Sequence, residues 1–429
     1  MSVDNTEGDF NSTPLRHKWQ DQNIDSTVRE TLSRDDKCFL HQSLSTPCLT
    51  EIVKCEGSYL IDASGRKYLD FHGNSLHQIG YSHPKIIDAI KLQLDELSFC
   101  PRRFTNKPAI ALAEKLGKFA PGELNKVLFA PGGTSAIGMA MKLARYATGR
   151  HKTISMWGTF HGASLDAISI GGESLFRDDL GPLLPGCFHV PWPKQTADAD
   201  EIEKIMEKEG DIGAIISEPM RCTTVEKPED GYWLRLRELC DRFGALLILD
   251  EIPLAFGRTG KMFCCEHSGV IPDILVVGKG LGGGIFPMAS IIAKNNLDIA
   301  QLKAIGHYTH EKSPVGAAAA LAMFDVIESE KLIDRSASLG RKTKMELERL
   351  FSNLSIVKEI RGLGLALAIE ITRPDISEFI LYECLSNGLS FKVSNGNVLT
   401  LTPPLTITDQ EMDKAVCIIK AAFQKAQSL

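Results

Sequence analysis

The sequence predicts an α/β fold with a mostly parallel central sheet, and three observations support this class. Between about residues 105 and 300, short apolar runs alternate with helical patterns. These runs are continuous rather than alternating, which indicates strands buried on both faces, as in parallel sheets. With 429 residues, the chain can bury a large core and is long enough for two domains.

Five strands and one connecting helix are the clearest elements of this region. Leu236, Leu239, Cys240 and Phe243 recur at helical spacing, and Gly244 stands where a helix-terminating glycine belongs. The strands are predicted at 127–130, 153–157, 214–217, 245–249 and 274–277.

From about residue 315 the pattern changes to longer helices around short strands. We expect a flexible N-terminal arm at 1–25, a large domain at 61–314, and a smaller α+β domain built from 26–60 and 315–429. In the C-terminal part, helices are predicted at 315–329, 335–351, 376–387 and 409–427, with strands at 365–371 and 398–401.

Composition excludes several classes of protein. The chain is 43% hydrophobic and 24% charged, and its net charge of −6 has no basic block, which argues against binding to nucleic acid. No apolar run is long enough to cross a membrane, and the polar N-terminus lacks a signal sequence. The eleven cysteines are scattered and lack metal-ligand spacing, so we expect reduced thiols, no metal site and a cytoplasmic location.

Lys279 and Asp250 are the candidate catalytic pair. Each follows a predicted strand, and the carboxyl ends of parallel strands meet at one edge of the sheet. A lysine or an acid in such a place is, taken alone, most often a solvated loop residue or a helix cap. Together they suit pyridoxal 5'-phosphate (PLP): the amine forms the Schiff base, and the carboxylate keeps the pyridine nitrogen protonated.

The segment that contains both residues resembles the signature of the class III aminotransferase family. The resemblance rests on Asp250-Glu251-Ile252, Phe256 to Lys261, Glu266 to Val270 and Gly278-Lys279-Gly280, and it extends from about residue 50 to 420. It implies PLP fold type I, with a large PLP-binding domain beside a smaller one.

Further cofactor residues follow from a glycine-rich turn and from the resemblance. Gly133 and Thr134 lie between a strand and an apolar helix, where backbone N–H groups and the helix dipole favour a phosphate. The resemblance aligns them with the phosphate loop of the family and aligns Phe160 with an aromatic residue that stacks on the pyridine ring. It also aligns Thr309 with a threonine that reaches the phosphate of a neighbouring subunit, which implies a homodimer with shared sites.

The chain departs from the family where amino-acid transaminases hold a substrate carboxylate. Thr400 stands at the position of the clamping arginine, and Thr223 stands at the position of the glutamate that pairs with it. Loss of a buried charged partner costs roughly 2–5 kcal/mol, so a carboxylate substrate is expected to bind poorly. In the Asp250 motif, Pro253 replaces a glutamine that contacts the phenolic oxygen of the cofactor.

A different anion can be held elsewhere. Arg103 lies where family members that act on phosphorylated amines carry an arginine, and guanidinium suits phosphate or phosphonate oxygens. Arg221 and Lys392 are weaker candidates. Asn74 suits a substrate hydroxyl or an anionic group, or else satisfies the backbone of a turn.

These departures most resemble a subgroup of the family that releases ammonia from a β-hydroxy amine bearing a phosphonate. We therefore predict a PLP-dependent ammonia-lyase for a small amino-phosphonate, with Lys279 as the catalytic base. Two alternatives stay open: an ω-amine:keto-acid aminotransferase, and a catalytically silent PLP-fold binding subunit.

Overall fold

The computed structural model describes residues 13–427 and divides them into two compact units. The large unit comprises Pro84–Cys222 and Glu226–Asp334. The small unit comprises the residues up to His83, the segment Thr223–Val225 and the residues from Arg335 onward. The two units are divided after His83 and Asp334. The sequence predicts these boundaries after residues 60 and 314.

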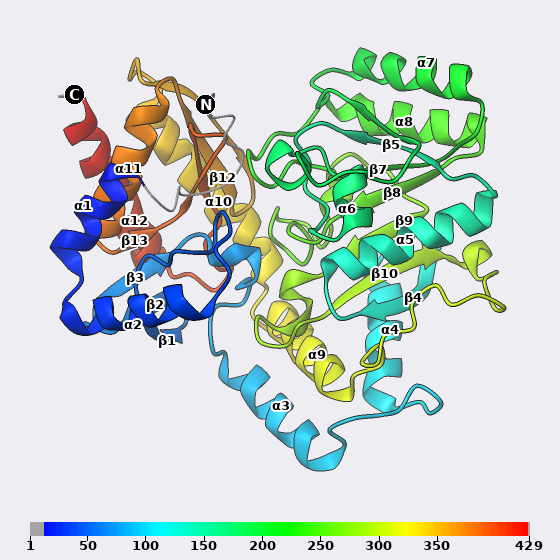
Figure 1. The fold of residues 1–429 in the computed structure, drawn as a ribbon, viewed down its shortest axis with the longest axis horizontal. Coiled ribbons are helices and arrows are strands. Elements are labelled where there is room, and N and C mark those ends of the chain that lie inside the picture. The colour runs from blue at the N-terminus through cyan, green and yellow to red at the C-terminus, as the bar shows by residue number, and fades with distance from the viewer. Residues whose placement is uncertain (1–12, 428–429) are drawn as a thin grey trace. The chain divides into compact units, whose positions relative to one another are not determined.

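The large unit contains a seven-stranded sheet of order β4-β10-β9-β8-β7-β5-β6 (Figure 1). Only β10 is antiparallel to its neighbours β4 and β9, so the predicted, mostly parallel sheet is confirmed. The strands are β4 (Leu124–Ala130), β5 (Lys152–Met156), β6 (Cys187–Val190), β7 (Ile212–Ser217), β8 (Leu246–Asp250), β9 (Ile274–Val277) and β10 (Ala289–Lys294).

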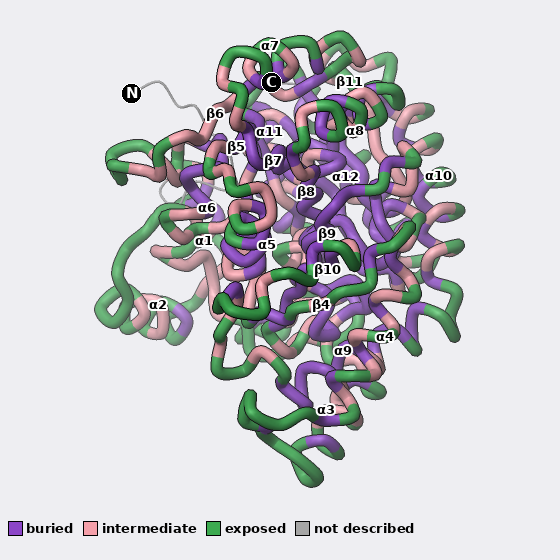
Figure 2. Tube along the Cα trace, turned by 90° about the vertical axis from the view of Figure 1, so that its right-hand side faces the viewer, coloured by how far each residue is buried: buried purple, intermediate pink, exposed green. Residues whose placement is uncertain are grey.

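Continuous apolar runs become the buried central strands, as expected. Every residue of β7 and β9 is buried, and the tube in Figure 2 shows these strands in the interior colour. The helix predicted before Gly244 is α8, and Gly244 ends it in the left-handed conformation with φ of 66°. The helices of the large unit are α3 (Pro84–Glu96), α4 (Lys107–Phe119), α5 (Gly133–Thr148), α6 (Leu165–Ile170), α7 (Ala199–Glu209), α8 (Asp230–Phe243) and α9 (Pro314–Ser329).

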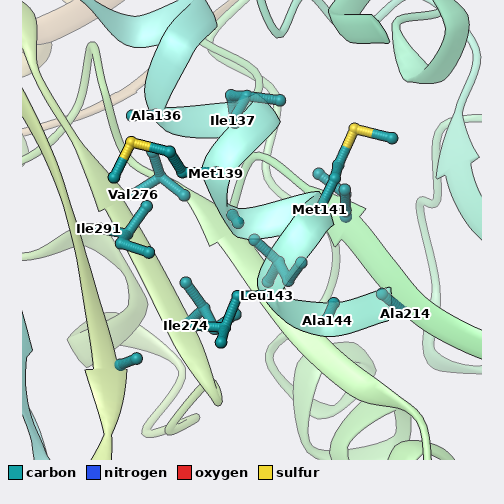
Figure 3. Packing of buried hydrophobic residues seen from close by; sticks show 14 of the residues in the cluster. Ala136, Ile137, Met139, Met141, Leu143, Ala144, Ala214, Ile274, Val276 and Ile291 are labelled. Carbon is teal, nitrogen blue, oxygen red and sulfur yellow. The ribbon is translucent and has the colours of Figure 1, made fainter. Parts of the chain in front are cut away.

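Helix α5 packs along this sheet and forms one wall of its core. Its alanine and methionine side chains meet residues of β9 and β10, including Val276 and Ile291 (Figure 3). Small residues on α5 allow the helix to lie close to the strands. This packing fixes the N-terminus of α5 at the edge of the sheet where β4 ends.

The small unit contains two four-stranded sheets, of order β1-β2-β3-β13 and β11-β12-β15-β14. The N-terminal hairpins and the C-terminal region share the first sheet, because Leu389 of β13 pairs in parallel with Leu69 of β3. The strands are β1 (Ile52–Glu56), β2 (Tyr59–Asp62), β3 (Lys67–Asp70), β11 (Val357–Leu363), β12 (Ala366–Ile371), β13 (Leu389–Ser390), β14 (Lys392–Ser394) and β15 (Val398–Leu401).

Five longer helices complete this unit, and one of them alters the prediction of an N-terminal arm. Residues 1–12 lie outside the described part of the chain, but α1 follows directly, capped by Thr13 and opened by Pro14. Trp19 of α1 is only 2% exposed, so this part of the predicted arm is a packed helix. The helices are α1 (Pro14–Asn23), α2 (Ser26–Cys38), α10 (Leu332–Phe351), α11 (Pro374–Ser386) and α12 (Asp409–Ala426). Within residues 13–427, no helix is both long and apolar enough to span a membrane.

Candidate active site

Asp250 and Lys279 lie at the carboxyl edge of the large sheet, as the sequence predicts. Asp250 ends β8 and pairs with Val276 of β9, and Lys279 follows three residues later. Asp250 is 2% exposed, whereas Lys279 is half-buried. Lys279 has φ of 47°, in the left-handed region that costs a non-glycine residue energy, so the fold constrains this lysine strongly.

A buried histidine holds the carboxylate of Asp250. Nδ1 of His161 donates a hydrogen bond of 2.8 Å to Oδ2 of Asp250, while Oδ1 accepts from the backbone N–H of Ile252 at 3.0 Å. Both side chains are almost fully buried. The carboxylate is thereby fixed in orientation and can face a cationic ring nitrogen.

The loop that carries Phe160 and His161 is fastened to the candidate phosphate loop. The hydroxyl of Thr134 lies 2.6 Å from the Ser164 hydroxyl and accepts the Ser164 backbone N–H at 3.2 Å. Gly162 has φ of +125°, and a Cβ there would lie 2.8 Å from Cα of Thr134. Only glycine allows this approach, so the fold requires Gly162 to join the two loops.

Ile252 brings the remaining segments together. A Cβ on Gly133 would lie 2.8 Å from Cδ1 of Ile252, and a Cβ on Gly278 would lie 3.3 Å from its Cγ2. The start of α5 and the turn before Lys279 therefore contact the same side chain, two residues after Asp250. The segments that carry the predicted residues Gly133, Thr134, Asp250 and Lys279 therefore lie close together.

The start of α5 fits a phosphate group. Gly132 is the N-cap of this 16-residue helix and offers no side-chain cap. The first-turn N–H groups have no intrahelical acceptor, and the helix dipole adds positive potential there. Because the Thr134 hydroxyl already holds Ser164, backbone N–H groups are the main donors that this turn can offer.

Two other sequence candidates lie beside the same loop. The centroid of the Phe160 ring lies 4.6 Å from the centroid of the Phe176 ring, and Phe160 is half-buried. Nε of Arg221 donates to the carbonyl of Gly158 at 2.9 Å, and its Nη1 lies 3.5 Å from the Glu226 carboxylate. Arg221 therefore supports the Gly158–Phe160 turn and has a carboxylate beside its charge.

Glu218 is a second buried carboxylate at this edge. Ser217 pairs with Leu249, so Glu218 and Asp250 are the next residues of two adjacent parallel strands. Burial raises the pKa of Glu218, the electrostatic effect of His161 opposes that shift, and Asp250 adds to it. The backbone N–H of Cys222 donates to Glu218 at 3.1 Å.

In the small unit, the two threonines that replace the clamp contact each other. The Thr400 hydroxyl donates to the carbonyl of Thr223 at 2.5 Å and lies 3.2 Å from the Ser394 hydroxyl. The structure therefore brings these two positions together without a charge at either. Lys392 of β14 pairs with Thr400 of β15, so its side chain belongs to the same face of the sheet.

Asn74 follows β3, also in the small unit. It has φ of 48° in a short turn between Gly73 and Ser75, and both of these residues also have positive φ. The Asn74 side chain lines a pocket together with His72 and Lys392. Its position in a strained turn fits both interpretations made from the sequence: a contact to the substrate, or a side chain that satisfies the backbone of the turn.

Arg103 and Thr309 lie on neighbouring exposed loops of the large unit. The rings of Phe99 and His310 are 5.2 Å apart, and the Asn106 side chain donates to the carbonyl of Lys312 at 3.0 Å. These contacts join the two loops, and both Arg103 and Thr309 are exposed.

Sequence reasoning missed His161, Ser164 and Glu218. The only signal for His161 was its place next to Phe160, and an isolated histidine among apolar residues is more often a core residue. Glu218 directly follows a predicted strand, but nothing in the sequence placed it level with Asp250. No group of three or more histidine, cysteine or acidic side chains that could hold a metal occurs within the described residues.

Comparison with known proteins identifies the family to which the chain belongs. The profile of the family described as "Aminotransferase class-III" matches residues 41–423, and the chain belongs to this family. It is 44% identical to the (R)-1-hydroxy-2-aminoethylphosphonate ammonia-lyase of Vibrio splendidus (strain 12B01), over 98% of this chain and 95% of that protein.

Solved structures agree with the fold. A transaminase from a marine Virgibacillus superposes with a TM-score of 0.89 at 27% identity, covering 93% of this chain and 99% of that one. An ornithine aminotransferase from Toxoplasma gondii, described with partial occupancy of PLP at its active site, has a TM-score of 0.86 at 27% identity, covering 97% and 99%. The predicted family membership and fold type are confirmed.

Proposed function

We propose that this protein is a PLP-dependent ammonia-lyase that converts (R)-1-hydroxy-2-aminoethylphosphonate to phosphonoacetaldehyde and ammonia. The observation that carries the proposal is the 44% identity to the Vibrio enzyme of that name, over 98% of the chain. The uncharged contact between Thr400 and Thr223 supports it, because a transaminase that alternates between two carboxylate substrates needs a cation for each of them.

The large unit would hold PLP through residues that the site already joins. Backbone N–H groups at Gly133 and Thr134 would bind its phosphate, Phe160 would pack on its ring, and Asp250 would face its ring nitrogen. When bound, PLP withdraws electrons from the amine-bearing carbon of a substrate and makes the proton on that carbon acidic.

Lys279 would act twice in this proposal. Its amine would anchor the cofactor and, once displaced by the substrate amine, would remove the proton from the amine-bearing carbon. Hydroxide would then leave the neighbouring carbon. Water would hydrolyse the resulting enamine to the aldehyde and ammonia, so no amino acceptor is consumed.

The proposal includes a homodimer with shared sites. Arg103 and Thr309 lie on adjoining exposed loops, from which each could reach a second copy of the chain. Large apolar side chains are exposed around these loops, which is typical of a covered interface. They include Leu97, Phe99, Phe104, Ile110 and Leu128. We place the enzyme in the cytoplasm, a location that the eleven cysteines, none of them in a disulfide, support.

Ammonia measured without an amino acceptor tests the reaction. Purified holoenzyme is incubated with (R)-1-hydroxy-2-aminoethylphosphonate, and ammonia and phosphonoacetaldehyde are expected in equal amounts. Turnover that appears only after pyruvate or 2-oxoglutarate is added would reject the lyase and favour an ω-amine transaminase. A protein without visible cofactor absorbance would instead favour the silent binding subunit.

A further inference from the structure

Arg177, in the large unit, caps the C-terminal end of helix α6. It directly follows the 3-10 turn η2 (Ser174–Phe176). Its Nη1 donates to the carbonyl of Ser169 at 3.3 Å and to the carbonyl of Gly171. The last carbonyls of a helix lack intrahelical donors, and a cation beside them also interacts favourably with the helix dipole. Arg177 therefore holds this end of α6 in place.

The opposite end of α6 is joined to the candidate phosphate loop. Ser164 is the N-cap of α6, and its backbone N–H donates to the Thr134 hydroxyl at 3.2 Å. The helix spans only Leu165–Ile170, so a single short element connects Arg177 with the turn that begins α5. A rigid element of this kind transmits a displacement from one of its ends to the other.

His189 and Trp157 hold the guanidinium group from a second side. Nη1 of Arg177 lies 2.8 Å from Nε2 of His189, and Cζ lies 5.2 Å from the centroid of the Trp157 ring. The rings of His189 and Trp157 are themselves stacked, with centroids 4.4 Å apart. Burial and the positive charge of Arg177 lower the pKa of His189 to about 4, so at neutral pH the imidazole is neutral and can accept from arginine.

The loop that carries Phe160 is paired with the segment that follows α6. The backbone N–H of Gly158 donates to the Gly172 carbonyl at 3.0 Å, and the backbone N–H of Gly172 donates to the Thr159 carbonyl at 2.8 Å. A Cβ on Gly172 would overlap the carbonyl oxygen of Met156, so this approach requires glycine. The end of α6 that Arg177 caps is therefore connected by hydrogen bonds to the backbone next to Phe160.

Phe176 adds a direct contact to the Phe160 ring. The centroids of the two rings lie 4.6 Å apart. Phe176 is the residue before Arg177, so the cation that caps α6 also anchors the turn that carries this ring. A ring whose orientation is already fixed by its neighbours loses less entropy when a ligand packs on it.

We infer that Arg177 is a positioning residue for the cofactor, which acts through α6 on the phosphate-binding turn and through Phe176 on the Phe160 ring. The inference rests on the proposed function in one respect, the assignment of Gly133, Thr134 and Phe160 to PLP. It goes beyond that assignment because Arg177 acts through these residues rather than by contact with PLP.

Titration of the apoprotein with PLP, followed by visible absorbance, measures the effect. Arg177→Met should weaken PLP binding about tenfold or more, and Arg177→Lys should recover part of the affinity, because an ammonium can still cap α6. Arg150→Met is the matched control. Nη1 of Arg150 donates to the carbonyl of Phe243 at 2.8 Å, at the C-terminal end of α8, and Arg150 precedes β5, away from the carboxyl edge of the sheet.

The control variant should lose stability without losing affinity for PLP. Unchanged affinity in Arg177→Met, or an equal loss of affinity in Arg177→Met and Arg150→Met, would overturn the inference.

A double-mutant cycle tests the contact between the two rings, even if Arg177→Met fails to fold. Phe160→Ala and Phe176→Ala are each expected to weaken PLP binding. Because Phe176 acts through Phe160, the variant that carries both substitutions should bind PLP about as well as Phe160→Ala alone. Losses that multiply in the double variant would contradict the inference.

The remaining outcomes separate the positioning role from the reaction. If PLP affinity depends on Arg177 but the loaded enzyme releases no ammonia without an acceptor, the proposed reaction fails and the positioning role stands. If ammonia is released while Arg177→Met binds PLP as the native protein does, the reaction stands and the positioning role fails. Full PLP affinity in Phe160→Ala would reject both the assignment of Phe160 and the inference built on it.

Discussion

Nδ1 of His161 donates to Oδ2 of Asp250 at 2.8 Å, with both side chains almost completely removed from solvent. The two residues are 89 positions apart, and the loop that carries His161 is also held to Thr134 by the backbone N–H of Ser164. The hydrogen bond therefore depends on the candidate phosphate loop as well as on the strand that carries Asp250.

His161→Gln should weaken the binding of PLP. Removal of a buried hydrogen bond to a charged group costs about 1.5–3 kcal/mol, which corresponds to about ten- to hundred-fold in affinity. Visible absorbance during titration of the apoprotein with PLP measures the effect. His267→Gln is the control, because His267 is a half-buried histidine of the large unit that contacts Thr259 instead. Equal PLP affinity in both variants would contradict a role for His161.

Gly162→Ala should separate the Phe160 loop from the phosphate loop. The added Cβ would meet Thr134 at 2.8 Å from its Cα, at φ of +125°, so we expect a loss of about 1–3 kcal/mol and poor retention of PLP. Gly149→Ala provides the comparison: Gly149 also has positive φ, at 67°, but a Cβ there meets nothing within 4 Å. Its cost should stay near 1 kcal/mol, with PLP retained. Thermal and chemical unfolding, together with cofactor content, distinguish the two variants.

Glu251 should make the stability of the fold depend on pH. Burial raises the pKa of its carboxyl to about 7, against the opposing effect of the Cys265 and Cys264 backbone N–H groups, which donate to it at 2.7 and 2.5 Å. The folded protein then keeps a proton that the unfolded chain loses above its ordinary pKa of 4.5. The free energy of unfolding should therefore fall as pH rises from about 4.5 to about 7, by up to roughly 3 kcal/mol.

Glu251→Gln removes this titration. Denaturant unfolding at pH 5 and pH 8 should show a larger loss of stability at the higher pH in the native protein than in the variant. Other carboxyl groups contribute equally to both proteins, so the difference between them isolates Glu251. Parallel pH profiles would show that this carboxyl keeps an ordinary pKa.

Arg103 and Lys279 should complement each other between subunits if Arg103 serves a neighbouring site. Lys279→Ala should lower turnover by at least about 10²–10⁴-fold, and Arg103→Ala should lower it through KM. A mixed dimer of the two variants would contain one site with both native residues, so each mixed dimer should release ammonia at about half of the native rate, and a random equimolar mixture at about a quarter.

The control carries both substitutions in one subunit, mixed with native chains. If Arg103 serves the neighbouring site, each site of this mixed dimer lacks one of the two native residues. The control mixture should therefore show little activity beyond that of the native homodimers that it contains. If Arg103 instead acts on Lys279 of its own chain, the first mixture stays inactive and the control recovers. The two arrangements thus give opposite results.

Much of the large unit could be predicted because its strands are buried on both faces. The runs at 214–217 and 274–277 became central strands β7 and β9, and Asp250 and Lys279 followed directly from where such strands end. Strand β10 was missed, and its apolar residues could not have shown that it runs antiparallel, because an apolar run carries no direction. Strand β6 was also missed, since it lies at the sheet edge and is only partly buried.

The rest of the site depends on contacts between distant segments. Ile252 was noted only as part of a motif, yet its side chain contacts Gly133 and Gly278. The segment Thr223–Val225 belongs to the small unit although the chain on both sides of it belongs to the large unit. No local pattern encodes either relationship, because each arises only when the sheets have formed.

The convergence of the Gly133, Gly278 and Asp250 segments on Ile252 has a thermodynamic consequence. These segments span about a third of the chain, so a ligand that needs them all binds the completed large unit and has no affinity for a partly folded one. Mass action then couples occupancy to folding: PLP at a hundred times its dissociation constant would add about 2.7 kcal/mol to the unfolding free energy. In a cell, the supply of the cofactor would therefore help to set how long each copy of the enzyme escapes proteolysis.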